Sequence, residues 1–323
     1  MSAERERPTV PEMELRSYYG RPVIKQPVWT WEIPLYLFSG GLAGGSAGLA
    51  YLSERAGFDP LARRAWAIAL GGVLASPALL ISDLGRPARF LNMLRMFRVT
   101  SPMNLGSWLL TVAGGTTALA AADTLLPPPM RARLPAPAGR GLALAAPLAR
   151  PAAAVLGLSL STYTAALVSN TAVPAWHEAR HTLPFLFAGG AAASAGAAAA
   201  IATPARHAGP ARRLAVFGTA LEIGASKAME IRLGELGEPY HTGTAGKLNR
   251  IADGLAAAGG LTVGAFGRRR PAAVAGGALL LAGAVCKRWA VFKAGFQSAA
   301  DPKYTVGPQR SRIESGAARA LAD

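Results

Sequence analysis

Long stretches without a charged residue alternate with short basic clusters along most of this chain. A helix needs about 20 apolar residues to cross a hydrocarbon core roughly 30 Å thick. Eight stretches approach or reach that length, and they cover residues 34–53, 65–82, 105–126, 152–169, 183–203, 214–229, 251–267 and 271–289. They are rich in Gly and Ala, which let helix backbones pack closely in lipid. The pattern predicts an all-α membrane protein with eight transmembrane helices, arranged as two four-helix bundles.

Polar segments divide the chain into four parts. The expected division is a polar N-terminal segment over 1–33, the first five spans over 34–203, the remaining spans over 204–296 and a polar C-terminal tail over 297–323. After the third span comes a Pro-rich link, LPPPMRARLPAPAGR, which we do not expect to form regular helix.

The sixth and seventh spans are the weakest of the eight. Glu222 and Lys227 interrupt the sixth, and the seventh is short and rich in Gly. If one of them lies only at the membrane surface, the count falls to seven. The short loops opposite the termini are basic, as at Arg268–Arg270. Because the positive-inside rule acts most strongly in short loops, we expect both termini to lie outside.

Two of the apolar stretches resemble each other. PLYLFSGGLAGGSAG (Pro34–Gly48) is similar to PFLFAGGAAASAG (Pro184–Gly196), and each follows a segment that contains Trp and Glu. Four spans separate the two, so a true repeat would produce two halves of like orientation. Chance similarity between helices rich in small residues explains the match equally well.

Composition narrows the class of protein further. The chain is 51% hydrophobic and 16% charged, with a net charge of +16. Its Lys and Arg lie at the ends of apolar segments, and no basic stripe is interleaved with aromatic residues as nucleic-acid binding would need. A single cysteine, Cys286, excludes disulfides and iron–sulfur clusters within the chain. The four histidines lie at span ends or in loops, and His177 and His181 have no third ligand nearby, so we expect neither haem nor a metal site.

The most distinctive polar sequence joins the second and third spans. It is LLISDLGRPARFLNMLRMFRVTSPMNLGSWLL, residues 79–110. Its motifs are Asp83-Leu84-Gly85-Arg86-Pro87, Arg89-Phe90, Ser101-Pro102-Met103 and Gly106-Ser107-Trp108. They resemble the DLGRP…RF…ML…SPM…GSW pattern of the NrfD/polysulphide reductase membrane subunit family. The resemblance extends to WEIPLYLFSGGLAGG, to the region of Tyr163 and to LPFLFAGGAAASAG, and so covers roughly residues 28–200.

This resemblance implies an eight-helix anchor that exchanges electrons between the membrane quinone pool, menaquinone or ubiquinone, and a ferredoxin-like iron–sulfur subunit. In such complexes the iron–sulfur subunit connects to a catalytic subunit, often a molybdopterin enzyme. The chain would then be a multi-pass protein of the plasma or inner membrane that catalyses no reaction alone. The loop 83–104, with Arg86, Arg89, Ser101 and Trp108, would form part of the surface that docks the partner.

A quinone headgroup needs an apolar slot and hydrogen-bond partners that can exchange protons. Glu32 and Tyr36 lie at the start of the first span, Tyr163 lies in the fourth, and Asn170 and His177 follow it. Starts of odd spans and ends of even spans share one membrane face, which places Glu32, Tyr36, Asp83, Asn170 and His177 on the same side. The family resemblance implies that polar residues at the start of the first helix and a Tyr of the fourth helix line the quinone pocket, so we predict a quinone site of Tyr36, Tyr163, Glu32, Asn170 and His177. Tyr163 matches the family's Tyr in place, whereas Tyr36 stands where some members carry His. A Tyr near the interface can also be an aromatic-belt residue.

Two carboxylates are candidates for proton handling. Asp83, after the second span, either handles protons or forms a structural ion pair with Arg86. Glu222 lies in the middle of the sixth span, where a charge is costly and commonly functional. It can equally pair with Lys227, five residues further along.

A secondary transporter or permease with a parallel four-helix repeat is the alternative function. The many spans and the Gly-rich first and fifth stretches suit it as well. A purely structural anchor without quinone chemistry is a third. The match over 83–104 favours the redox anchor, and neighbouring genes for a ferredoxin and a molybdopterin oxidoreductase would favour it further.

Overall fold

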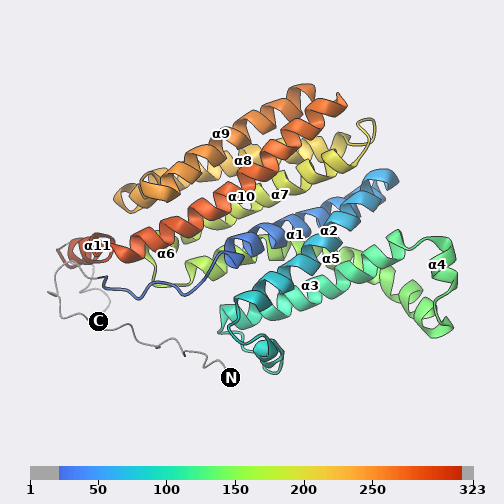
Figure 1. Cartoon of the computed structure of the whole chain (residues 1–323), viewed down its shortest axis with the longest axis horizontal. Coiled ribbons are helices and arrows are strands. Elements are labelled where there is room, and N and C mark those ends of the chain that lie inside the picture. The colour runs from blue at the N-terminus through green and yellow to red at the C-terminus, as the bar shows by residue number, and fades with distance from the viewer. Residues whose placement is uncertain (1–21, 315–323) are drawn as a thin grey trace, which may run out of the picture.

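The computed structural model describes residues 22–314, and all of the regular secondary structure in this part of the chain is helical (Figure 1). The elements are α1 (Glu32–Arg55), α2 (Asp59–Asp83), η1 (Pro87–Leu94), α3 (Pro102–Leu125), α4 (Pro128–Ala132), α5 (Ala136–Ser169), α6 (Pro174–Glu178), η2 (Ala179–His181), α7 (Leu183–Ala202), α8 (Gly209–Leu233), η3 (Gly234–Tyr240), α9 (Gly243–Phe266), α10 (Arg270–Ala300) and α11 (Lys303–Glu314).

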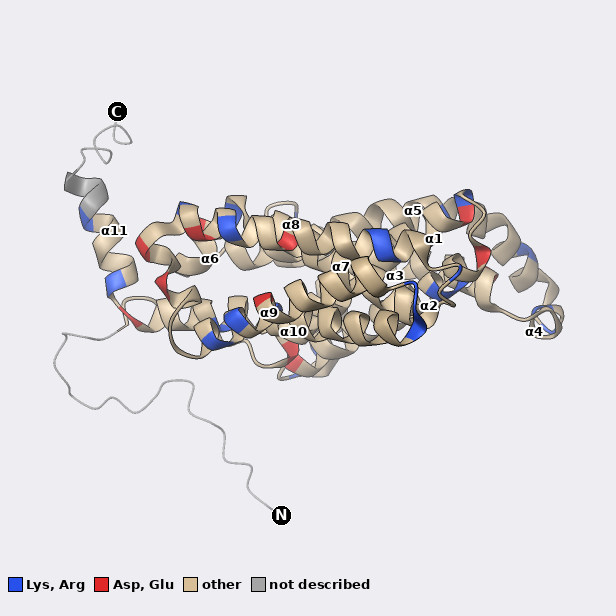
Figure 2. Cartoon of the chain, turned by 90° about the horizontal axis from the view of Figure 1, so that it is seen from above, with Lys and Arg blue, Asp and Glu red and all other residues tan. Residues whose placement is uncertain are grey.

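The long helices overlap the predicted apolar stretches one for one. Between residues 22 and 314, five of them are long and apolar enough to cross a membrane, namely α2, α3, α5, α7 and α10. The chain is therefore a multi-pass membrane protein. The helices α1, α8 and α9 fall outside that criterion, α1 with its many Gly and Ser residues and the other two with charged residues along their length. The prediction of eight spans stays a prediction. In Figure 2 most charged residues lie towards the ends of the long helices.

Two helices, α1 and α7, hold the long helices together. The helix α1 packs against α2, α5 and α7, while α7 packs against α8 and α10 as well as α1. Figure 1 shows α7 to α10 side by side, with α1, α2, α3 and α5 beside them. Small residues permit this close packing. A methyl group at Gly44 of α1 would overlap the backbone of Gly157 in α5, so this crossing requires glycine.

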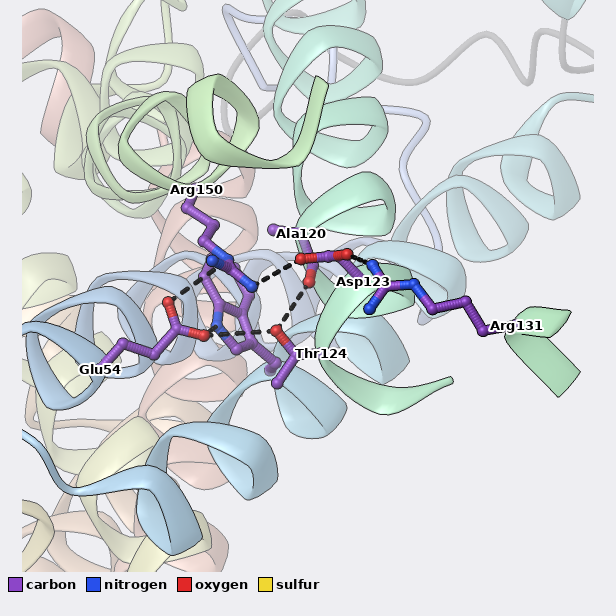
Figure 3. Close-up of polar contacts among 7 residues, drawn as sticks. Glu54, Ala120, Asp123, Thr124, Arg131 and Arg150 are labelled. Atoms are coloured by element: carbon purple, nitrogen blue, oxygen red, sulfur yellow. Dashed lines mark hydrogen bonds and ion pairs between the residues drawn. The ribbon is translucent and has the colours of Figure 1, made fainter. Parts of the chain in front are cut away.

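A polar network closes the far end of the first four long helices (Figure 3). Arg150 of α5 lies 2.7 Å from Asp123 of α3 and 3.5 Å from Glu54 of α1. The same Glu54 accepts hydrogen bonds from the indole of Trp66 (2.8 Å) and the hydroxyl of Thr124 (3.3 Å). Asp123 also pairs with Arg131, which follows α3 in the chain. This network ties α1, α2, α3 and α5 together at one membrane face.

The prediction that residues 126–140 lack regular helix is wrong. The short helix α4 lies in this link, and α5 already begins at Ala136, well before the expected start of the fourth span at Ala152. Pro128 and Pro137 lie in the first turns of their helices, where a missing backbone N–H costs nothing. With 34 residues α5 is about 50 Å long, which exceeds the hydrocarbon thickness. Figure 1 shows α4 beyond the ends of the other helices.

The expected C-terminal tail over 297–323 is also partly helical. The helix α10 continues to Ala300, and α11 covers Lys303–Glu314, beyond which the chain is outside the described residues. Lys303 of α11 forms an ion pair with Glu238 of η3 at 2.8 Å. Of the predicted polar segment 1–33, residues 1–21 lie outside the described part.

Candidate functional site

A pocket opens between α1, α2, α3 and α5 at the face where α1 begins and α2 ends. It holds about 910 Å³ of space not filled by protein atoms, part of it open to the surroundings. Most of its walls are apolar. The lining residues are Trp29, Ile33, Tyr36, Leu37, Pro77, Leu80, Asp83, Leu84, Phe90, Met93, Met103, Gly106, Ser107, Leu110, Thr111, Tyr163, Leu167 and Val168.

Tyr36 and Tyr163 both line this pocket, but their hydroxyl groups are engaged differently. The hydroxyl of Tyr163 donates a hydrogen bond to the backbone carbonyl of Pro102. Its ring lies against Gly106 of α3, where any side chain would overlap it. Tyr36 is only 2% exposed, and its hydroxyl has no hydrogen-bond partner among residues 22–314. Because a buried tyrosine hydroxyl normally finds a partner, Tyr36 is the group left for a ligand.

The predicted carboxylates Glu32 and Asp83 meet at the edge of the pocket through Thr30. The Thr30 hydroxyl donates to Asp83 Oδ1 at 2.7 Å, and its backbone N–H lies 3.3 Å from the same oxygen. The hydroxyl also contacts the Glu32 carboxylate. A hydroxyl has one proton to donate but can accept as well, so it can join two carboxyl groups in a hydrogen-bonded chain. Sequence reasoning missed Thr30, because nothing local marks a partner 53 residues away.

The segment between α2 and α3 covers the pocket and is held by Asn104, a second residue that the sequence did not single out. The side-chain amide of Asn104 donates to the carbonyls of Met93 (2.8 Å) and Met96 (2.9 Å), and its oxygen accepts from Arg98 N–H (2.7 Å). An Asn in the first turn of a helix commonly bonds nearby backbone in this way, and that was the available signal.

The predicted docking residues contribute to this segment in two ways. Ser101 caps the start of α3, since its hydroxyl accepts from Asn104 N–H at 3.4 Å. The indole of Trp108 donates to the carbonyl of Met96 at 3.0 Å. Arg86 and Arg89 are exposed. Asp83 and Arg86 form no ion pair in the described chain, so that alternative is wrong.

Asn170 and His177 lie apart from the pocket. Asn170 is exposed at the C-terminal cap of α5. His177 lies in α6, where its Nδ1 is 3.2 Å from the carbonyl of Ser169, and it lines a separate hollow beside Tyr304. The structure thus brings the two tyrosines and the two carboxylates together, but not these two residues.

Glu222 lies elsewhere, buried between α7, α8 and α10. The alternative in which Glu222 pairs with Lys227 is wrong, because the Lys227 ammonium lies 2.7 Å from Glu230. Within residues 22–314, Glu222 Oε1 has no hydrogen-bond partner. A methyl group at Gly190 would lie 2.6 Å from this oxygen and 3.0 Å from Arg288 Nη2, so the carboxylate and the guanidinium flank one glycine.

Arg288 and Lys287 of α10 are both 2% exposed. Arg288 donates to the carbonyl of Phe187 at 2.9 Å and lies 3.8 Å from the centre of its ring. Lys287 donates to Asn249 (2.7 Å) and Asp253 (2.6 Å) of α9. Opposite charges thus accompany each buried cation, as burial in an apolar bundle requires.

Comparison with known proteins identifies one family. The family model described as polysulphide reductase, NrfD, matches residues 22–229, which is well over half of the 323 residues. A search of the curated proteins found no match to this chain. In the described part of the chain, no three His, Cys, Asp or Glu side chains lie close enough to share a metal ion.

Proposed function

The chain belongs to the NrfD family, and from this premise we propose that it is the quinone-reactive membrane anchor of an oxidoreductase complex, with the quinone headgroup bound between Tyr36 and Tyr163. The family implies a membrane anchor subunit of such a complex. The observation that carries the quinone assignment is the apolar pocket with one unpartnered tyrosine hydroxyl at the membrane face where a partner can reach it.

The residues present fit a quinone. Its ring and isoprenoid tail are apolar, as are most of the lining side chains, and its carbonyls need hydrogen-bond donors. When bound, the quinone supplies two-electron, two-proton redox chemistry. Tyr36 offers a free hydroxyl donor. Tyr163, whose own proton is committed to Pro102, shapes the wall and keeps α3 against α5.

Protons must enter or leave such a pocket whenever its ligand is reduced or oxidised. Asp83 lines the pocket, and Thr30 links it to Glu32. We assign proton exchange at the pocket to this chain of three residues. Glu222 remains a second proton-handling candidate in the other half of the molecule, since its carboxylate is buried beside Arg288 and its Oε1 has no hydrogen-bond partner among the described residues.

The segment between α2 and α3 is the proposed docking surface for a ferredoxin-like iron–sulfur subunit, which in turn serves a molybdopterin-type catalytic subunit. Phe90 and Met93 of this segment line the pocket. On its outer side, Phe97 (63% exposed) and Val99 (68%) lie near several exposed arginines. An iron–sulfur cluster docked on this segment would be separated from the quinone headgroup mainly by the side chains of the segment that line the pocket.

Helix packing supports eight spans in two four-helix bundles, one of α1, α2, α3 and α5 and the other of α7, α8, α9 and α10. In each set, every helix packs against its neighbour in the chain and the last packs back against the first. Such halves would also suit a transporter, but membership in the NrfD family favours the anchor.

Replacement of Tyr36 by Phe tests the proposal. In the complete complex purified from membranes, Tyr36→Phe should reduce quinone-linked turnover about tenfold or more, which corresponds to the loss of one hydrogen bond of about 1.5 kcal/mol. Tyr51→Phe, at the opposite end of the same helix, is the matched control and should leave turnover unchanged. Equal turnover in the wild type, Tyr36→Phe and Tyr51→Phe would contradict the assignment of the quinone headgroup to this pocket.

A further inference from the structure

A second large hollow lies on the other side of α1, in a groove between α1 and α5 on one wall and α7 and α8 on the other. It holds about 1370 Å³ of space, much of it open. Its lining residues are Gly45, Gly48, Leu49, Leu52, Ser53, Ala56, Phe58, Leu158, Ser161, Thr162, Ala188, Ala191, Ala192, Pro210, Arg213, Leu214 and Phe217. We propose that this groove is a binding site for one anionic phospholipid, with its phosphate on Arg213 and an acyl chain along the floor.

The dimensions of the groove match one leaflet of a bilayer. Its lining runs along α1 from Ala56, at the helix end, to Gly45. The rise from Gly45 to Ala56 corresponds to a length of about 16 Å, close to half of a hydrocarbon core roughly 30 Å thick. Gly45, Gly48 and Ala192 have small side chains or none, which leaves the groove deep enough for a hydrocarbon chain. Leu52 and Phe217, both more than 60% exposed, form apolar rims that only lipid or protein would cover.

The charge lies at one end of the groove only. Arg213 forms no ion pair or hydrogen bond with any described residue, and it is exposed. In the middle of the groove, Ser161 and Thr162 donate to carbonyls of their own helix. Ser53, nearer the end of α1, has a buried hydroxyl without a hydrogen-bond partner in the described chain. A free guanidinium at the membrane surface with an apolar channel leading from it corresponds to the two parts of a phospholipid.

The surroundings of Arg213 make a neutral ligand a poor match. No Asp or Glu occurs between Glu178 and Glu222, or between Asp253 and Asp301, so the α7–α8 and α9–α10 loops at this end carry only basic charges. The turn between α1 and α2 at the same end is flanked by the exposed Asp59 and by Glu54, which already accepts hydrogen bonds from Trp66 and Thr124. Arg213 and Arg268 both repel Arg212 electrostatically. A phosphate bound here would reduce that repulsion. None of the lining side chains is a Tyr, His, Asp or Glu that could exchange a proton with a quinone.

Native mass spectrometry of the full chain in mild detergent, with added phosphatidylglycerol or phosphatidylcholine, tests the assignment. The wild-type protein should retain one tightly bound phosphatidylglycerol and prefer it over phosphatidylcholine. Arg213→Gln should lower that preference about fivefold, the effect of one arginine near a lipid phosphate. Arg206→Gln, which removes an exposed charge of the same loop outside the groove, is the control and should bind as the wild type does.

A second variant separates the groove from general attraction to the basic face. Ala192→Leu keeps every charge but fills the floor, and it should lose the bound lipid while α7 remains folded. Equal retention of phosphatidylglycerol by wild type, Arg213→Gln and Ala192→Leu would overturn the proposal. So would equal retention of the two lipids by the wild type, or occupation of the groove by added ubiquinone in place of phospholipid.

Discussion

Thr30 lies two residues before the start of α1 and Asp83 is the last residue of α2, and the two are joined by a 2.7 Å hydrogen bond from hydroxyl to carboxylate. This hydrogen bond connects the segment that leads into α1 with the end of α2, beside the proposed quinone pocket. It also gives Asp83 a defined orientation, with one oxygen engaged by both the hydroxyl and the backbone N–H of Thr30.

Removal of the Thr30 hydroxyl should slow proton exchange at the pocket. Thr30→Val keeps the shape but loses the hydrogen bonds to Asp83 and Glu32. Because a hydrogen bond to a charged group contributes about 1.5–3 kcal/mol, we expect quinone-linked turnover in the complete complex to fall roughly tenfold or more. Thr30→Ser, which retains the hydroxyl, should recover most of the activity. If Val and Ser variants turn over equally, the hydroxyl has no part in proton exchange.

Asn104 should prove essential to the docking segment. Asn104→Ala removes three hydrogen bonds to the backbone between Met93 and Arg98, and should weaken the local structure by about 2 kcal/mol. We expect faster hydrogen exchange in residues 87–101 and loss of the iron–sulfur partner on purification. Asn170→Ala, at an exposed site outside this segment, should retain the partner. Retention of the partner by the Asn104 variant would argue against docking at this surface.

Arg150 should stabilise the end of the molecule opposite the pocket. Arg150→Met leaves Glu54 and Asp123 without their shared cation. A fully buried pair broken in this way costs about 3–5 kcal/mol, and partial exposure here reduces the expected cost to about 2 kcal/mol. The melting temperature in detergent should fall by about 4–8 °C. Arg140→Met, at an exposed position of the same helix, should melt within a degree or so of the wild type.

The attachment of α11 should weaken in acid. The hydrogen bond from Lys303 holds the pKa of Glu238 below its ordinary value. A carboxyl group whose pKa is lowered in the folded state stabilises that state above its ordinary pKa, and the stabilisation is lost as the pH falls through the lowered value. The distance between spin labels on α6 and α11 should therefore lengthen in that acidic range. In Lys303→Gln it should be long and independent of pH, and a wild-type distance that never changes would contradict the prediction.

Much of the fold follows from local properties of the chain. The apolar stretch predicted over 183–203 is the helix Leu183–Ala202, and the stretch predicted over 105–126 is Pro102–Leu125. Hydropathy summed over some 20 residues depends on no distant partner, so these helices can be recognised one at a time. The Pro-rich link was predicted wrongly because a Pro inside a helix breaks it, whereas a Pro in the first turn of a helix is well tolerated. Pro128 and Pro137 of this link lie in the first turns of α4 and α5, a position that the local sequence did not reveal.

The chain by itself also determined the family, through motifs that lie within residues 79–110, and the identity of the two tyrosines and two carboxylates as candidates. Only the tertiary structure decided how they are used. In the folded chain the Tyr163 hydroxyl donates to Pro102, whereas the Tyr36 hydroxyl is free. Asp83 is hydrogen-bonded to Thr30, and Glu222 lies beside Arg288 rather than Lys227. Each of these outcomes depends on how closely two helices approach, and that distance is set by small residues such as Gly106 and Gly190 on the facing surfaces.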